Sequence, residues 1–427
     1  MEHQRNVGHT RAGVYIHPIA TFGVVTHFRS FGDLEAPCGR LHGAWHGCRV
    51  RAKRTPVRIA LFCPSYGQVG GIEEKARVLI EAFRAQGHAV TVLARGEPAT
   101  SGSDGDVPVV RSDYHQMPRR ARHVARQFRF LRERPRATRA LRRAVTAAGS
   151  EVVLTLAITS YAPYASALAA AAPLVLSLEG GEPGGRFTAN PRALRTALRR
   201  ATRVVACARS LAASARALAP EVGPRLSVIP NGVEPGLFAN GRAHAHPRPY
   251  VAAVGRLVPQ KGFDVLLEAF ARLGVPQVDL LIAGDGPERR RLEALRERLG
   301  LAARAHLLGA VDRATVASLY QGARLVVCPS RWEGLPLVCL EAMASGRAVV
   351  ASRVDGIPDA VGDGETGLLV PPEDPIALAG ALRTLLADGP RRERLGARGR
   401  ALVCDELTWA SVAERYLAVL ADAVAAH

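Results

Sequence analysis

Residues 57–94 read "VRIALFCPSYGQVGGIEEKARVLIEAFRAQGHAVTVLA", and this stretch predicts the fold of the first half of the chain. It opens with a short apolar run typical of a buried strand, which ends at Pro64. Glycines follow within 67–71, and apolar residues then recur at helical spacing until Gly87. Residues 88–94 supply a second strand. Strand, glycine-rich turn, helix and strand in that order predict a parallel βαβ unit.

The same alternation continues along the chain, with a break at the polar, aperiodic stretch 235–249, which we interpret as a linker. We therefore predict an α/β chain with two Rossmann-like domains that face each other across a cleft. Ligands of such sheets bind at the carboxyl ends of the strands, so the loops after strands should carry the chemistry. Further strands are expected at 152–156, 174–178 and 204–206, and then, in the second series, within 250–257, 279–286, 305–309, 323–330, 346–352 and 366–370.

The domain prediction has four parts. Residues 1–55 are a basic extension that holds six of the thirteen histidines and is expected to be disordered. Residues 56–234 form an N-terminal domain, 235–403 a C-terminal domain, and 404–427 a C-terminal helix. Cys38, His42, His46 and Cys48 of the extension could ligate zinc, but the segment lacks a regular pattern, and an unstructured leader is favoured.

Composition excludes several classes of protein. No stretch approaches the roughly 18 unbroken apolar residues of a membrane-spanning helix, and the N-terminus lacks the order of a secretory signal. The seven scattered cysteines suit a reducing compartment. We therefore expect a cytoplasmic protein, with peripheral contact at the inner face of the membrane left open.

The net charge is +19, and residues 116–143 carry eleven arginines against one acid, Glu133. Phe128, Phe130 and Leu131 lie among these arginines, as in an amphipathic helix that approaches anionic lipid. A solvated charged face is the favoured interpretation of the block. Nucleic acid is not an expected partner, because no nucleic-acid-binding motif accompanies the charge.

Three loops after predicted strands hold candidate site residues. The first, "GQVGGIEE" at 67–74, has glycines between a strand and a helix, which suits either phosphate binding or a tight turn. The second includes Arg256 and Lys261, two cations beside a helix start, which could clamp a diphosphate or be solvated loop charges. Lys261 is one of only three lysines in an arginine-rich chain, which favours a need for a compact ammonium there.

The third loop opens the stretch "SRWEGLPLVCLEAMASG" at 330–346, where Glu333 precedes a predicted helix and Glu341 lies within it. Their Cα atoms should be about 7–12 Å apart, given a rise of about 1.5 Å per helical residue. Glycosidase carboxyl pairs are about 5–9.5 Å apart, so side chains could close that gap. The other interpretation is that the two carboxylates hold separate parts of one elongated ligand.

Taken together, these motifs resemble those of the retaining glycosyltransferases of family 4, which have the GT-B fold. The resemblance covers about residues 57–425 and rests on "GGIE" at 70–73, "VIPNGV" at 228–233, Arg256 with Lys261, "GDGP" at 284–287 and the 330–346 stretch. It implies a donor-binding cleft between the two domains. It also implies that the C-terminal helix, including 407–420, crosses back to the first domain.

The resemblance assigns roles to individual residues. Arg256 and Lys261 would neutralise the leaving diphosphate, Gly70 and Gly71 would meet it from the other domain, and Glu333 would hold the donor sugar. The remaining implied donor contacts are Glu341 at the ribose, the loop at Gly309 on the nucleobase, and the backbone of Gly334, Leu335 and Pro336 at the sugar and phosphate. The donor would be a UDP- or GDP-linked sugar, with no separate cofactor and no metal; Asp104-Gly105-Asp106 lies in a turn-like segment and is not expected to bind one.

Glu179 departs from the family pattern. Many relatives have a histidine near the reacting carbon, where this chain has "LSLEGGEPGG" at 176–185. Glu179 could bind substrate, take part in catalysis or be structural, and these alternatives stay open.

The resulting functional expectation is a hexosyltransferase that moves a sugar with retention to an acceptor hydroxyl. The acceptor is either a lipid or polysaccharide precursor or a small natural product. Two alternatives remain. One is a non-catalytic protein that binds nucleotide sugars, favoured by the missing histidine. The other is a nucleotide-sugar epimerase, disfavoured because no acid and base poised at the sugar carbons can be placed.

Overall fold

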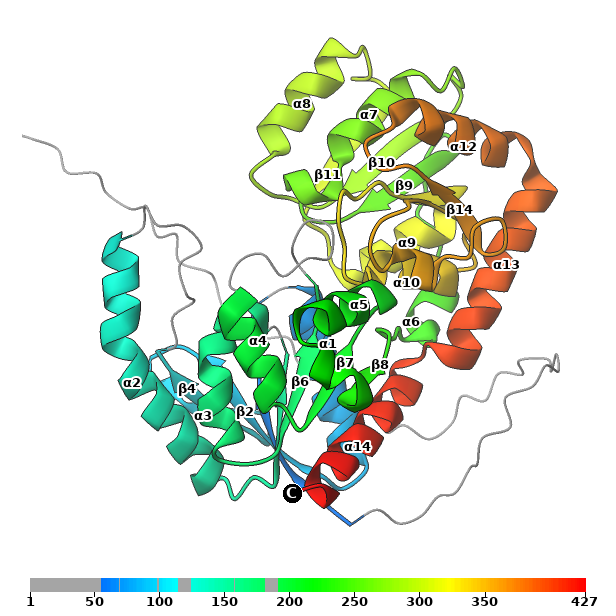
Figure 1. Ribbon diagram of the computed structural model, residues 1–427. Helices are drawn as coiled ribbons and strands as arrows, with labels where there is room; N and C mark the ends of the chain where they lie inside the picture. The colour runs from blue at the N-terminus through cyan, green and yellow to red at the C-terminus, as the bar shows by residue number, and fades with distance from the viewer. Residues whose placement is uncertain (1–54, 69, 98–99, 114–123, 157, 181–190) are drawn as a thin grey trace, which may run out of the picture. The chain divides into compact units, whose positions relative to one another are not determined.

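The computed structural model describes residues 55–427 except 69, 98–99, 114–123, 157 and 181–190 (Figure 1). The extension at 1–54, with Cys38, His42, His46 and Cys48, therefore lies outside the described residues, as does the start of the arginine block. Among the residues described, no helix has both the length and the apolar character that crossing a membrane requires.

The first half of the chain forms an eight-stranded sheet in the order β3-β4-β2-β1-β5-β6-β7-β8. Its strands pair in parallel, apart from the antiparallel pair β3 and β4 at one edge. The predicted βαβ unit at 57–94 is confirmed as β1, α1 and β2. The strands are β1 (Arg58–Phe62), β2 (Ala89–Arg95), β3 (Gly102–Asp104), β4 (Val107–Ser112), β5 (Val152–Thr155), β6 (Leu174–Leu178), β7 (Arg203–Ala206) and β8 (Leu226–Val228).

Both faces of this sheet are buried, as expected for parallel strands. Alternate residues of β1 point to different cores: Ile59 and Leu61 pack with α1 and α14, whereas Ala60 and Phe62 pack with α2 and α3. The helices of this half are α1 (Gly71–Ala85), α2 (Val124–Ala147), α3 (Ala165–Ala169), α4 (Pro191–Arg200) and α5 (Arg209–Leu218). The next helix, α6 (Pro235–Ala239), opens the stretch 235–249 predicted to be a linker, and through its buried Phe238 it packs against the second half of the chain, so the linker prediction is wrong for these residues.

The second half forms a six-stranded parallel sheet in the order β11-β10-β9-β12-β13-β14. Its strands are β9 (Tyr250–Val254), β10 (Asp279–Ala283), β11 (Ala305–Gly309), β12 (Leu325–Cys328), β13 (Val349–Ser352) and β14 (Gly367–Val370). Its helices are α7 (Phe263–Ala271), α8 (Arg289–Arg298), α9 (Arg313–Gly322), α10 (Leu337–Ala344), α11 (Ile357–Ala360), α12 (Pro375–Ala387) and α13 (Gly389–Glu406). The predicted α/β fold with two Rossmann-like sheets is confirmed.

The last helix, α14 (Trp409–Ala425), packs against the first half of the chain. Its buried residues Trp409, Tyr416 and Leu420 share one core with α1 and with β1. The chain reaches α14 beside Val233, whose N–H donates to the carbonyl oxygen of Leu407 at 2.9 Å. The exact domain boundaries stay a prediction.

Candidate active site

Lys261 and Glu333 meet where the carboxyl ends of β9 and β12 lie side by side in the second sheet. Lys261 Nζ is 2.5 Å from Glu333 Oε1, and Ser330 Oγ donates to the same oxygen at 2.8 Å. The backbone N–H of Glu333 donates to Asp355 Oδ2 at 3.0 Å. Burial alone lowers the pKa of Lys261, but the Glu333 carboxylate more than offsets this and raises it, so the ammonium stays charged.

Arg256 lies two residues after β9 and is exposed. No hydrogen bond or ion pair joins its side chain to any of the described residues, whereas Lys261 is paired. The neighbouring backbone is tight: a Cβ on Gly284 would lie 1.9 Å from the carbonyl oxygen of Gly255, so the Gly284 position requires glycine. Among the described residues, these strand ends therefore present one cation without a partner, Arg256, and one carboxylate-bound cation, Lys261.

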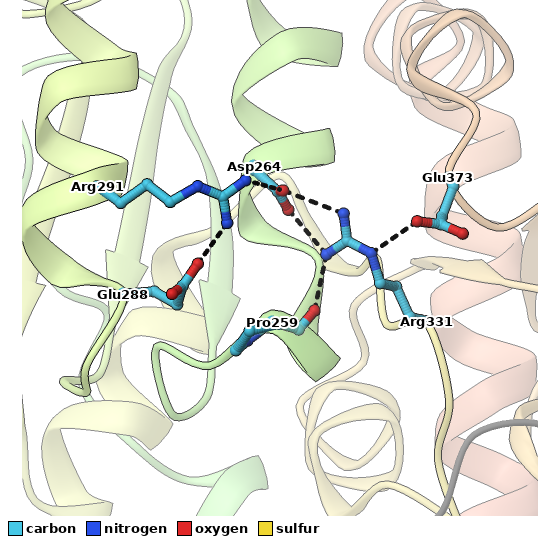
Figure 2. A network of polar contacts seen from close by, with 6 residues as sticks. All are labelled: Pro259, Asp264, Glu288, Arg291, Arg331 and Glu373. Carbon is cyan, nitrogen blue, oxygen red and sulfur yellow. Dashed lines mark hydrogen bonds and ion pairs between the residues drawn. The ribbon is translucent and has the colours of Figure 1, made fainter.

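A network around Arg331 holds the Lys261 turn against the Glu333 loop (Figure 2). Its guanidinium donates two parallel bonds to Asp264 at 2.9 and 3.0 Å, a third to Glu373 at 2.8 Å, and a fourth to the carbonyl oxygen of Pro259 at 2.7 Å. Such a fork is geometrically specific. Burial alone raises the pKa of Asp264, but Arg331 holds it below its usual value. Sequence reasoning missed both Arg331 and Asp264, because arginine is common throughout this chain.

Glu341 lies on α10 in a different environment from Glu333. Arg313 of α9 lies 3.6 Å from Glu341 Oε1 and also forms an ion pair with Glu74 of α1. Burial raises the pKa of Glu341 to about 7, with Arg313 opposing the shift and Glu74 adding to it. Glu333 and Glu341 therefore have separate partners, Lys261 and Arg313, and show no sign of a carboxyl pair that shares one proton.

The raised pKa of Glu341 predicts a pH effect on stability. Folded Glu341 titrates near 7 and the unfolded group near 4.5, so the folded state holds the extra proton between these values. Stability then falls as pH rises through this window and levels above it. We expect Glu341→Gln to remove this decline, which amounts to about 3 kcal/mol because the pKa rises from 4.5 to about 7, at about 1.4 kcal/mol per pKa unit. Urea denaturation at pH 4.5, 6 and 8 measures the free energy of unfolding of both proteins. If this free energy changed with pH in the same way in both, the raised pKa of Glu341 would be contradicted.

Glu179 follows β6 and forms a buried ion pair. Both of its carboxylate oxygens lie 2.8 Å from Lys75 Nζ, and the side chains of Lys75 and Glu179 are 1% and 3% exposed. Ser177 Oγ donates to Glu179 Oε1 at 2.6 Å and lies 2.8 Å from Tyr416 Oη of α14. Burial alone lowers the pKa of Lys75, but Glu179 more than offsets this and raises it. Glu179 is therefore engaged on both oxygens in this structure.

Lys75 is the functional candidate that sequence reasoning missed. One signal could have found it: Lys75 is one of three lysines in the chain and lies next to Ala76 on the buried face of α1. Lys75 Nζ also donates to the side-chain oxygen Oδ1 of Asn231 at 3.0 Å, and Asn231 Nδ2 donates to the backbone oxygen of Leu335 at 2.8 Å. The Glu179 cluster is thereby connected to the 330–346 stretch of the second half.

The glycines of the site allow close backbone contact between the two halves. A Cβ on Gly334 would lie 2.2 Å from the carbonyl oxygen of Glu179, and one on Gly180 would lie 2.6 Å from the Cα of Gly334. Gly70 is the N-cap of α1, and a Cβ on Gly71 would be 3.7 Å from Leu337 Cδ1 of α10. The first turn of α1, which can bind an anion through its free N–H groups, thus lies beside the 330–346 stretch.

The other predicted residues occupy the ends of elements. Pro336 is the N-cap of α10, which ends at Ala344 before the left-handed Gly346. Gly309 ends β11 in the left-handed region, and its carbonyl oxygen accepts from the Gly284 N–H at 2.7 Å. The Gly309 loop therefore adjoins the "GDGP" turn. Asp104-Gly105-Asp106 forms the turn between β3 and β4, where Asp104 accepts from Tyr66 Oη at 2.8 Å.

Comparison with known proteins supports the resemblance. Residues 69–237 match the family described as Glycosyltransferase Family 4, and residues 239–402 match the family described as Glycosyl transferases group 1. An alpha-maltose-1-phosphate synthase from Mycolicibacterium smegmatis is 32% identical over 294 residues, which is 61% of this chain and 76% of that protein. A D-inositol 3-phosphate glycosyltransferase from Corynebacterium diphtheriae is 41% identical over 181 residues, which is 40% of this chain and 42% of that protein.

For four of the curated relatives, including the one from Corynebacterium diphtheriae, the match spans only about half of the relative's length. Among solved structures, sucrose-phosphate synthase from Thermosynechococcus elongatus has a TM-score of 0.74 and 26% identity, over 87% of this chain and 100% of that one. HepE from Anabaena, solved with UDP and glucose, has a TM-score of 0.66 and 20% identity, over 86% and 100% of the two chains, and supports the fold alone. Two adjoining family matches, a relative aligned over most of its length and the GT-B fold lead to one conclusion: this chain belongs to the group 1, family 4 glycosyltransferases.

Proposed function

We propose that this protein is a retaining hexosyltransferase that moves a sugar from a UDP- or GDP-linked donor to an acceptor hydroxyl. The observation that carries the proposal is the arrangement at the ends of β9 and β12. There Lys261 is held by Glu333 at 2.5 Å, and Arg256 has no partner among the described residues. Lys261 and Arg256 are the positive charges that a leaving diphosphate needs.

In the proposed mechanism the donor diphosphate lies between Arg256 and Lys261 on one side and the first turn of α1 on the other. Cleavage of the glycosyl–phosphate bond builds negative charge on the diphosphate, and fixed cations and helix N–H groups stabilise that charge. Because this interaction strengthens as the bond breaks, it lowers the barrier rather than only tightening binding. Lys261 would turn from Glu333 toward the phosphate and leave the Glu333 carboxylate for the sugar hydroxyls.

The proposed transfer needs no carboxylate nucleophile. The bond from the anomeric carbon to the diphosphate breaks while the acceptor oxygen bonds to the same carbon from the same face, which retains configuration. The proton of the acceptor hydroxyl goes to the departing phosphate oxygen. Glu179 would then position the reacting face through Lys75 and Asn231, since both of its oxygens are already engaged. The donor is a substrate, and no separate cofactor or metal is proposed for this step.

Calorimetric titration tests the donor site directly. We expect either UDP or GDP to bind to the wild-type protein. The Glu341→Gln substitution should weaken the binding of that nucleoside diphosphate and leave the binding of inorganic pyrophosphate unchanged. The Lys261→Ala substitution should weaken the binding of both ligands. If Glu341→Gln bound neither the nucleoside diphosphate nor pyrophosphate, the proposal that Glu341 contacts the ribose would be contradicted. Absence of binding by either nucleoside diphosphate to the wild-type protein would contradict the donor site itself.

A second candidate function is nucleotide-sugar binding without transfer, and the Lys75–Glu179 pair is the observation that favours it. A carboxylate held on both oxygens is not free to act as a base. This candidate predicts donor binding with no release of nucleoside diphosphate across a broad acceptor panel. Release that depends on an acceptor would exclude it.

For the acceptor, we propose a lipid-linked or polysaccharide precursor at an anionic membrane surface, with a small natural product as the alternative. The proposal rests on α2, where Phe128 and Leu131 are 72% and 61% exposed. Arg132, Arg139 and Arg142 are exposed on the same face, and Phe130 is buried on the opposite one. Exposed apolar side chains among cations on one helix face suit adsorption to anionic lipid.

We expect Phe128→Ser/Leu131→Ser to reduce binding to phosphatidylglycerol vesicles at least about tenfold, because each buried apolar side chain contributes about 1.5–3 kcal/mol. Vesicle flotation measures this. Ile376→Ser is the matched control, since Ile376 is 73% exposed in the other half of the chain. Equal flotation of the double variant and the wild type, or no flotation of the wild type, would favour the soluble acceptor.

A further inference from the structure

A second cluster of polar side chains lies near the amino ends of the strands of the second sheet, whereas Lys261 and Glu333 follow the carboxyl ends. Asp279 is the first residue of β10 and His306 the second of β11, and His246 precedes β9. The donor loops follow the carboxyl ends of the same strands, and a five-residue strand is about 16 Å long. The cluster is therefore separate from the proposed donor site.

Both histidines of the cluster approach one carboxylate oxygen. His246 Nε2 is 2.8 Å from Asp279 Oδ2, and His306 Nε2 is 3.8 Å from the same atom. One ligand atom from each of the three residues lies within 4.8 Å of the other two. The imidazole rings meet edge to face with centroids 5.6 Å apart. Three metal-ligand side chains thus converge on one point.

His306 has an unmet bonding requirement. Its Nε2 is buried and has no hydrogen-bond partner among the described residues, because 3.8 Å is too long for a hydrogen bond. Buried polar atoms in folded proteins nearly always have a partner, so an orphaned nitrogen points to a missing one. A partner placed between the two imidazoles and the carboxylate would satisfy all three groups together.

We propose that His246 Nε2, His306 Nε2 and the Asp279 carboxylate form a zinc-binding site. Two imidazole nitrogens and one carboxylate oxygen are common zinc ligands, with bonds of about 2.0–2.2 Å. Ligand atoms around tetrahedral zinc lie about 3.3 Å apart, between the 2.8 and 3.8 Å contacts of this cluster. His246, together with Arg248, also lines a cavity of about 340 Å³ beside the cluster.

The surroundings of the cluster hold the ligands in place. Arg248 is 3.4 Å from Asp279 Oδ1, the oxygen that the histidines do not contact, and can orient the carboxylate from outside. Its side chain is 50% exposed, so solvent screens its charge. The Tyr250 ring packs edge-on against His246 at 5.5 Å, and its hydroxyl donates to the carbonyl oxygen of Leu319 at 2.8 Å. Ion binding then joins β10, β11 and the segment before β9.

The first experiment measures zinc per chain. Full-length protein is stripped with chelator, dialysed against Zn²⁺, and assayed by mass spectrometry of the metal. We expect wild-type protein to retain one equivalent more than His306→Ala or His246→Ala. His244→Ala is the matched control, because His244 lines the same cavity but is not one of the three ligands. Retention of the same zinc content by His306→Ala would overturn the proposal, as would failure of the wild type to retain any.

A second measurement excludes binding elsewhere. Cys38, His42, His46 and Cys48 could also take zinc, and Co²⁺ bound to thiolate gives an intense near-ultraviolet band that nitrogen and oxygen ligands lack. We expect Co²⁺ in the wild-type protein to show visible bands that disappear in His306→Ala and persist in Cys38→Ser/Cys48→Ser. Asp279→Asn keeps the side-chain shape but should weaken the binding of Zn²⁺ at least about tenfold, a loss typical of altered metal sites. Loss of the bands only in the cysteine variant would overturn the proposal.

Discussion

Replacing Lys261 with alanine is expected to lower kcat for glycosyl transfer by about 10²–10³-fold. Loss of a single preorganised donor to developing negative charge has about this effect. The side chain is nearly buried and bound to Glu333 at 2.5 Å, so its removal also leaves that carboxylate without its cation. The measurement is the initial rate of nucleoside diphosphate release at saturating donor, for both proteins in parallel.

Two further variants sharpen this comparison. Lys261→Arg keeps the charge, but its fork cannot reproduce a point contact with Glu333, and we expect partial rescue only. Arg394→Ala removes one exposed positive charge from α13 of the same half and should leave the rate unchanged. A rate for Lys261→Ala within about threefold of wild type would remove Lys261 from the diphosphate site.

The second large effect concerns stability. We expect Lys75→Met to cost about 3–5 kcal/mol of unfolding free energy, because it leaves the buried Glu179 charge unpaired. The double variant Lys75→Met/Glu179→Leu should recover most of this loss, since replacing a buried ion pair by apolar side chains is often neutral. Urea denaturation of the two single variants and the double variant gives the coupling free energy.

The exposed ion pair between Arg77 and Glu81 provides the control for this comparison. Arg77 and Glu81 form an ion pair on the exposed face of α1, where both side chains are more than half exposed, and Arg77→Ala should cost less than about 1 kcal/mol. If Glu179→Gln instead keeps its stability but loses transfer about 100-fold or more, Glu179 would act in catalysis. Its role as the partner of Lys75 would then be secondary.

The sequence was sufficient to predict the fold and one edge of the site. Apolar runs of strand length alternating with helical spacing determine a parallel sheet with helices on both faces, and both sheets follow that pattern. Because parallel strands present their carboxyl ends on the same side of a sheet, the sequence predicted that the loops after strands carry the chemistry, and the family resemblance implied that Lys261 and Glu333 contact the same donor. The two residues are 72 positions apart and are in contact.

Pairings between distant side chains could not be predicted in the same way. Lys75 and Glu179 are 104 positions apart, and no periodicity links them. Arg313, which joins Glu74 and Glu341, is one of many arginines and carries no local signal. The departure at Glu179 was visible, but its cause was not: the carboxylate lies opposite a buried lysine on another element. Such contacts depend on tertiary packing, which hydrophobic patterns do not encode.

The central claim is that Lys261, Glu333 and Arg256 form the donor site of a glycosyltransferase. Its most direct test is a proton NMR time course of the protein with UDP- and GDP-linked hexoses and a panel of acceptors. We predict that one donor is converted to its nucleoside diphosphate and to a glycoside of the same anomeric configuration, with Lys261→Ala slower by about 10²–10³-fold. Equal rates for the two proteins, or a product of inverted configuration, would contradict the account.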